Sequence, residues 1–72
     1  MKKHTLSCIC RHVAKKDPFR GSALLDLLGD IEVAFGADGK SAVVRGYIDG
    51  QPCIVAHIED DPELEAILSG RR

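Results

Sequence analysis

The chain has few aromatic residues and few cysteines, and both shortages limit what it can be. Its 72 residues include no tryptophan, one tyrosine, two phenylalanines and three cysteines. A surface that stacks nucleic-acid bases needs several exposed aromatic rings, so we do not expect one here. Any disulfide scheme would leave one of the three thiols unpaired, which favours a protein of a reducing compartment. We therefore expect a cytoplasmic protein without a disulfide framework.

Long apolar runs and the sequence motifs of common enzyme classes are also missing. No apolar stretch approaches the roughly 18 residues of a membrane-spanning helix, and Thr5–Cys10 is too short for the apolar part of a signal peptide. The chain has no glycine-rich phosphate loop, no Gly-x-Ser-x-Gly elbow and no His-Glu-x-x-His pair. We therefore expect a protein that is not an enzyme, needs no cofactor and does not act in a membrane.

The composition that is present is typical of one small globular domain. Hydrophobic residues make up 44% and charged residues 29% of the chain, whereas a disordered tail would have fewer apolar residues. We expect a single domain over residues 1–72, with frayed ends at residues 1–2 and 70–72. A core of this size rarely supplies more than about 3–5 kcal/mol, so a homodimer or an obligate partner is expected.

Opposite charges are concentrated in different parts of the chain, although the net charge is −1. Residues 1–20 carry six cations and one anion, while residues 21–72 carry four cations and ten anions. Such asymmetry is typical of a nucleic-acid contact, of an acidic surface that imitates nucleic acid, of charge pairing between the subunits of an oligomer, or of two solvated faces that partly neutralise each other. The sequence leaves these interpretations open.

A first helix is predicted over residues 3–16. Its apolar residues recur with the helical period and form one stripe: Leu6, Ile9, Cys10 and Val13. The opposite side of this helix carries polar side chains and one thiol: His4, Cys8, Arg11, His12 and Lys15. The helix is therefore amphipathic, with a basic outer side.

A second, largely buried helix is predicted over residues 22–28, with Ser22 as its N-cap. Its four leucines are too many for one exposed face. An alternative start at Pro18, with Asp17 as the cap, would also bury Phe19.

Residues 31–58 change to the period of two that marks half-buried strands. Asp38 and Gly39 form a strong hairpin-turn signal between two such strands. A two-residue loop at this point places Val33 opposite Val44 on one apolar face, so turn chemistry and alternation agree.

The second turn, over residues 49–52, leaves two registers open. A two-residue loop would put Cys53 and Val55 on the inner face of the sheet. A three-residue loop would put three apolar residues there instead: Ile54, Ala56 and Ile58. We expect the three-residue loop, together with a bulge, because it buries more apolar surface.

These elements predict an α+β fold in the order ααβββα, in which a three-stranded antiparallel meander packs against helices on one face. The last helix, over residues 62–68, is capped by Asp60 or Asp61. The outer face of the sheet is then half apolar with charged neighbours, as protein interfaces are, unless the first helix covers it. The residues expected to bind a partner are those of the outer face and two cations of the first helix: Val43, Arg45, Tyr47, Val55, His57, Arg11 and Lys15.

A metal or thiol site is a further possibility. His4, Cys8 and His12 follow one another at the i, i+4 spacing of helical metal ligands, and cations near Cys8 would favour a reactive thiol. Cys53 and His57 are candidate additional ligands on the sheet. Paired Cys-x-x-Cys spacing is absent, however, so we predict no metal site and keep these residues as weak candidates.

The leading hypothesis is a small non-enzymatic interaction module that modulates, or inhibits, a larger macromolecular partner by binding it. The first alternative is a nucleic-acid-binding transcriptional regulator that uses the basic first helix. Against it, residues 22–28 offer no Lys, Arg, Asn or Gln to contact base edges. The second alternative is a metal or thiol protein built on His4, Cys8 and His12.

Overall fold

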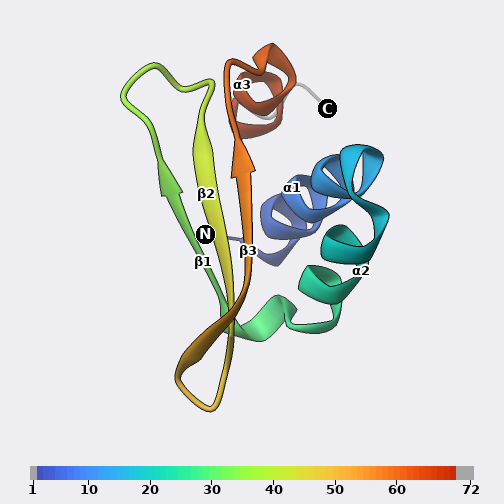
Figure 1. Cartoon of the computed structure of the whole chain (residues 1–72). Helices are drawn as coiled ribbons and strands as arrows, with labels where there is room; N and C mark the ends of the chain where they lie inside the picture. The colour runs from blue at the N-terminus through green and yellow to red at the C-terminus, as the bar shows by residue number, and fades with distance from the viewer. Residues whose placement is uncertain (1, 70–72) are drawn as a thin grey trace.

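The computed structural model describes residues 2–69, which form three α-helices and a three-stranded antiparallel sheet in the order α α β β β α (Figure 1). The predicted α+β fold is therefore confirmed. The elements are α1 (Lys3–Lys16), α2 (Pro18–Asp26), the 3-10 turn η1 (Leu28–Asp30), β1 (Ile31–Phe35), β2 (Ala42–Ile48), β3 (Gln51–Ile58) and α3 (Pro62–Leu68). Of the residues expected to fray, 1 and 70–72 lie outside the described part, and Lys2 is extended ahead of α1. No helix within residues 2–69 combines the length and the apolar character that a membrane crossing requires.

The core lies between the sheet and α1, α2 and α3, which pack on the same side of it (Figure 1). The largest fully buried side chains come from all of these layers: Ile9, Leu24, Leu64, Val44 and Cys10. Gly46 of β2 belongs to this inner face, and a side chain there would meet Leu24 and Leu27 at 3.2 and 3.1 Å. The absence of a side chain at Gly46 therefore lets Leu24 of α2 and Leu27, the C-cap of that helix, reach the sheet.

Helix α2 begins at Pro18, which is the earlier of the two predicted starts. The Asp17 carboxylate accepts a hydrogen bond from the Arg20 amide at 3.1 Å, which caps the helix. Gly21 faces α1, where an added Cβ would lie 2.3 Å from the Cβ of Ala14, so glycine sets the close approach of the two helices.

The expectation that this longer helix buries Phe19 is wrong, because the Phe19 side chain is 91% exposed. Two positions along an α-helix correspond to about 200° of rotation. Since Gly21 faces α1, Phe19 points away from the core. Helix α2 also ends at Asp26, before the predicted end at residue 28, and the chain continues as η1.

The first hairpin has the predicted register. Val33 pairs with Val44, and Phe35 pairs with Ala42. The loop contains Asp38 and Gly39, as expected, but spans residues 37–40, because the last backbone hydrogen bond runs from the Gly36 amide to the Ser41 carbonyl at 2.8 Å. The longer loop leaves the strand register unchanged.

The second hairpin reaches the predicted face by a different route. Its loop is two residues long, Asp49 and Gly50, whose φ values of 51° and 77° suit a tight turn, so the predicted three-residue loop is wrong. The predicted bulge is confirmed and lies in β3: Tyr47 pairs with Pro52 and Gly46 with Ile54, which leaves Cys53 as the extra residue. The bulge shifts the alternation by one residue and turns the expected three side chains inward: Ile54, Ala56 and Ile58.

Candidate functional site

The outer face of the sheet brings together the five sheet residues predicted to bind a partner. Along β2, Val43, Arg45 and Tyr47 alternate with the buried inner-face residues. On β3, His57 pairs with Val43 and Val55 pairs with Arg45. All of these side chains are half-buried except that of His57, which is exposed. We call this set the outer-face patch.

Helix α1 does not cover the outer-face patch, so the alternative that it does is wrong. Figure 1 shows α1, α2 and α3 on the opposite side of the sheet. The physical reason is that the apolar stripe of α1, with Ile9 and Val13, packs with Val44 of the inner face in one core. The patch therefore has no second layer from the described part of the chain.

Charge on the outer-face patch is partly neutralised within the sheet. The Arg45 guanidinium donates a hydrogen bond to the Glu32 carboxylate of β1 at 2.9 Å. The two side chains are 40% and 55% exposed, and exposed pairs of this kind contribute about 0.2–1 kcal/mol. What the patch offers a partner is therefore apolar surface from two valines and a tyrosine, with polar groups at its border.

A second cluster, unexpected from the sequence, joins α1 to the start of α3. His12 is 6% exposed, and its Nε2 lies 2.5 Å from Oδ2 of Asp61. Its Nδ1 lies 3.1 Å from Oε2 of Glu63 without making a hydrogen bond. The prediction of His12 on the open side of α1 is wrong, because α3 packs against that side. We call His12, Asp61 and Glu63 the interhelix cluster.

Asp61 has several roles in the interhelix cluster. Its carboxylate caps α3 by accepting a hydrogen bond from the Glu63 amide at 3.0 Å, which confirms one of the two predicted caps. Burial acts to raise the pKa of this carboxyl, but the hydrogen bonds from His12 and from the Glu63 amide outweigh burial, so the pKa lies below 3.8. Asp61 therefore stays ionised at neutral pH.

The cations at the end of α1 pair with the same acidic segment. Lys15 Nζ lies 3.3 Å from the Glu63 carboxylate, and Lys16 Nζ lies 3.4 Å from that of Asp61. The charge asymmetry of the chain is thus partly neutralised by contacts within one molecule. Of the two cations of α1 predicted to bind a partner, Lys15 takes part in this pairing and Arg11 is exposed.

The proposed metal or thiol residues do not converge. Cys8 Sγ lies 3.8 Å from Nε2 of His4, but the His12 ring is held by Asp61 between the helices. Cys53 is exposed in the bulge of β3, and His57 lies on the outer face. Within residues 2–69, no group of three or more His, Cys, Asp or Glu side chains is placed to hold a metal ion.

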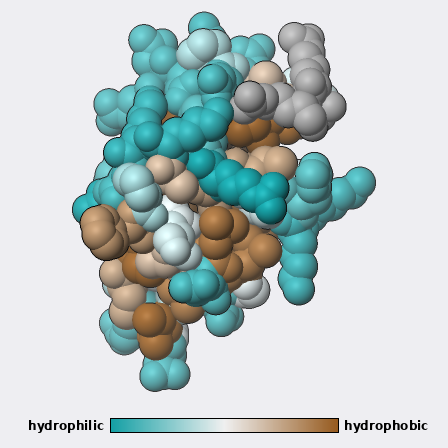
Figure 2. Space-filling model, turned by 90° about the vertical axis from the view of Figure 1, so that its right-hand side faces the viewer, coloured by the Kyte–Doolittle hydropathy of each residue, from teal (hydrophilic) through white to brown (hydrophobic). Residues whose placement is uncertain are grey.

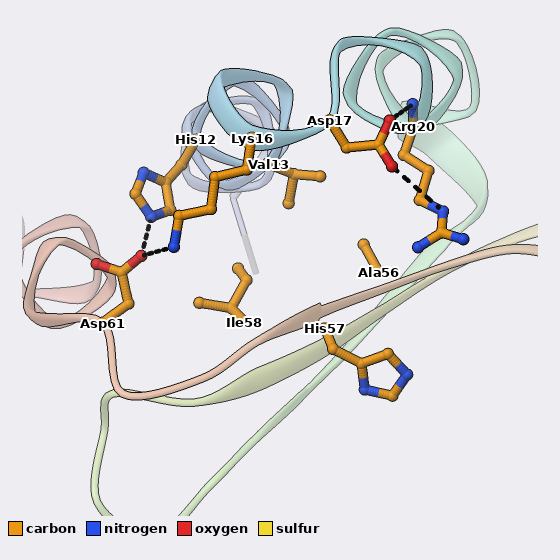
Figure 3. Close-up of a pocket in the computed structure, with 9 residues that line it drawn as sticks. All are labelled: His12, Val13, Lys16, Asp17, Arg20, Ala56, His57, Ile58 and Asp61. Atoms are coloured by element: carbon orange, nitrogen blue, oxygen red, sulfur yellow. Dashed lines mark hydrogen bonds and ion pairs between the residues drawn. The ribbon is translucent and has the colours of Figure 1, made fainter.

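A groove along β3 was not predicted from the sequence. One part is a cavity of about 70 Å³ beside Val13, Ala56 and Ile58, with Lys16 and Arg20 at its border (Figure 3). The groove depends on the distance between α2 and β3, which no local pattern encodes.

Comparisons of this chain with protein-family models, with curated proteins and with solved structures found no match.

Proposed function

We propose that this chain is a small non-enzymatic module that binds a larger protein and modulates or inhibits it by occupying part of its surface. The observation that carries the proposal is the outer-face patch: Val43, Tyr47 and Val55 lie together on a sheet face with no described helix over it. Tyrosine and arginine are enriched in protein interfaces, and both are present here as Tyr47 and Arg45.

The polar groups with the closest contacts support a binding role rather than a catalytic one. His12 and Asp61 are buried and bonded to each other, and Asp61 also caps α3. These groups hold two helices together, which is a structural task. A module without chemistry of its own acts on its partner by binding.

The nucleic-acid alternative has less support. Lys15, Lys16 and Arg20 each lie within 3.7 Å of a carboxylate of the same chain. The phosphates of a nucleic acid would have to replace all three contacts at once, and the net charge of the chain is −1. We further propose a cytoplasmic location, in keeping with the three free thiols of Cys8, Cys10 and Cys53.

The test is capture of partners from a lysate of the native host with three forms of the chain. The wild type and Ser22→Asp, a change at an exposed position of α2, are expected to capture the same protein. Tyr47→Asp is expected to lose it, because a carboxylate would be desolvated in the interface. Hydrogen exchange of the purified complex should then show slower exchange at β2 amides. Equal capture by Tyr47→Asp would reject the outer-face patch as the binding surface.

A further inference from the structure

The strand β3 lies at an edge of the sheet, since the strand order is β1-β2-β3. Within residues 2–69, its backbone hydrogen bonds to other segments go to β2 alone. Its other side therefore presents N–H and C=O groups that can pair with an added strand. Pro52 and the bulge at Cys53 blunt the beginning of this edge, which leaves residues 54–58 available.

An apolar groove follows this free edge. Near the beginning of β3, the groove is lined by Phe19 and Ala23 of α2 together with Ile54 and Val55. Hydrophobic side chains also gather in the lower half of the helical face, at the level of α2 (Figure 2). Phe19 is 91% exposed and therefore has no role in the core. Such exposure of a large apolar side chain beside an open edge indicates a contact surface.

Toward the end of β3 the groove deepens into the cavity of about 70 Å³. Figure 3 shows Val13, Ala56 and Ile58 in the space between α1 and β3, while His57 lies on the other side of the strand. The volume is enough for several water molecules or for one short aliphatic side chain. Arg20 lines both parts of the groove, so the two parts lie next to each other along β3.

The charges at the groove favour an acidic ligand. The side chains of Lys16 and Arg20 are 73% and 55% exposed. Lys16 lies 3.4 Å from the Asp61 carboxylate and Arg20 lies 3.7 Å from that of Asp17, and exposed ion pairs of this kind contribute little to stability. Both carboxylates keep other donors if the cations turn away: Asp61 accepts hydrogen bonds from His12 and the Glu63 amide, and Asp17 accepts one from the Arg20 amide. An incoming segment therefore meets cations that can turn toward it.

A second copy of this chain fits the groove less well than a foreign segment does. Residues 51–58 contain no acidic side chain. An antiparallel β3 strand from a second copy would therefore bring no carboxylate to Lys16 and Arg20, which line the groove.

We propose that the free edge of β3 binds an extended segment of a partner protein in which apolar residues alternate with Asp or Glu. The backbone of that segment adds a strand to the sheet, one apolar side chain enters the cavity, and a carboxylate pairs with Arg20 or Lys16. The inference rests on the proposed protein-binding function but uses a surface distinct from the outer-face patch.

The test begins with a displayed library of random peptides, selected on the full chain. We expect enriched peptides to alternate apolar with acidic residues. Fluorescence anisotropy then compares one enriched peptide on several forms of the chain. Phe19→Ser, and separately the double change of Lys16→Gln with Arg20→Gln, should weaken binding about tenfold or more, as the loss of charge-assisted contacts does. Lys3→Gln, which removes an exposed cation at the other end of α1, should leave binding unchanged.

A backbone measurement and one further variant complete the test. Bound peptide should slow hydrogen exchange of amides within residues 54–58, and Tyr47→Asp should bind the peptide as the wild type does. No enrichment, enriched peptides without acidic residues, or binding insensitive to the groove variants would overturn the proposal. The proposal would also be overturned if the free protein formed a concentration-dependent dimer in which these amides already exchange slowly, since a second copy would then occupy the edge. If Tyr47→Asp loses the captured partner while the groove variants keep it, the proposal for the β3 edge is rejected and the proposed function stands.

Discussion

His12 shows how one side chain connects elements that are far apart in the sequence. Its imidazole bonds to Asp61 across 49 sequence positions and lies beside Glu63. The i, i+4 pattern with His4 and Cys8 suggested a ligand on the surface, because a helical pattern shows which residues share a side but not what packs on it. The Asp61 cap was predictable from its position before Pro62, whereas its bond to His12 was not.

Replacing His12 with alanine is expected to destabilise the fold by about 2–4 kcal/mol. The change leaves the buried Asp61 carboxylate without its closest partner and opens a cavity between α1 and α3. Urea unfolding followed by circular dichroism measures the effect. Arg11→Ala, an exposed neighbour on the same helix, should stay within about 0.5 kcal/mol of the wild type. A similar small effect for His12→Ala would mean that the interhelix cluster does not stabilise the fold.

Asp61 should also make stability depend on pH in the acidic range. Its pKa in the folded protein lies below the ordinary value of 3.8, so the folded state favours the ionised form. That stabilisation is fully present above the ordinary pKa and is lost as the pH falls through the lower, folded-state pKa. Asp61→Asn should therefore be less stable than the wild type at neutral pH, with a difference that shrinks below about pH 4.

Urea unfolding at a series of pH values measures that difference. The neighbouring change Asp60→Asn is the control, since Asp60 is exposed and its φ of 47° is one that asparagine tolerates. A gap between Asp61→Asn and the wild type that stays constant down to pH 2 would contradict the assignment.

At the scale of elements, the joint between α1 and α2 depends on one glycine. Gly21 has no room for a methyl group, since the Cβ of Ala14 would lie 2.3 Å away. Alanine is the better helix former by roughly 1 kcal/mol, yet Gly21→Ala should destabilise the protein by about 1–3 kcal/mol because the helices must move apart. Thermal unfolding compares it with Ser22→Ala at an exposed position of the same helix. A more stable Gly21→Ala would show that the helices separate freely.

The two hairpins show where local patterns are sufficient and where they are not. The pairing of Val33 with Val44 followed from alternation and the Asp38-Gly39 signal together. In the second hairpin, the need to bury Ile54 and Ala56 identified the inner face, but the same parity results from a longer loop or from a bulge. The choice of Cys53 as the bulge is decided by the tight turn at Asp49 and Gly50 and by pairing along the strand.

At the scale of the whole molecule, the outer-face patch was predictable and the groove along β3 was not. Val43, Tyr47 and Val55 share a face because of strand alternation, which is a local property. The groove arises where Phe19 and Arg20 of α2 meet β3, and this depends on tertiary packing. Phe19 was expected in the core but is exposed, because the sequence shows that this residue is hydrophobic and does not show which way its side chain points.

The outer-face patch should also let two copies associate if no other protein occupies it. We expect a homodimer with Val43, Tyr47 and Val55 at the contact, because a core of this size gains stability from added burial. Tyr47→Asp should shift the protein to a monomer and lower its thermal stability. Light scattering coupled to size exclusion measures both forms at several concentrations. A wild type that remains monomeric at the highest concentration would reject the dimer and leave a larger protein partner as the explanation of the outer-face patch.

Duplex DNA should bind weakly or not at all at physiological salt. Lys15 and Lys16 are paired with carboxylates of α3 and its cap, and the net charge is −1. A mobility-shift titration over a range of salt concentrations tests this expectation, because phosphate contacts weaken steeply as salt rises. Nanomolar binding that persists at physiological salt would favour the nucleic-acid alternative.

The bond between His12 and Asp61 has a consequence for how the chain matures during translation. The ribosome releases α1 well before α3, whose Leu64 and Ile67 complete the core around Ile9. Until those residues emerge, the nascent chain has an exposed apolar stripe on α1 and an unfinished core. Contacts of such high sequence separation form late, so the domain acquires its native structure after synthesis of α3 and not progressively.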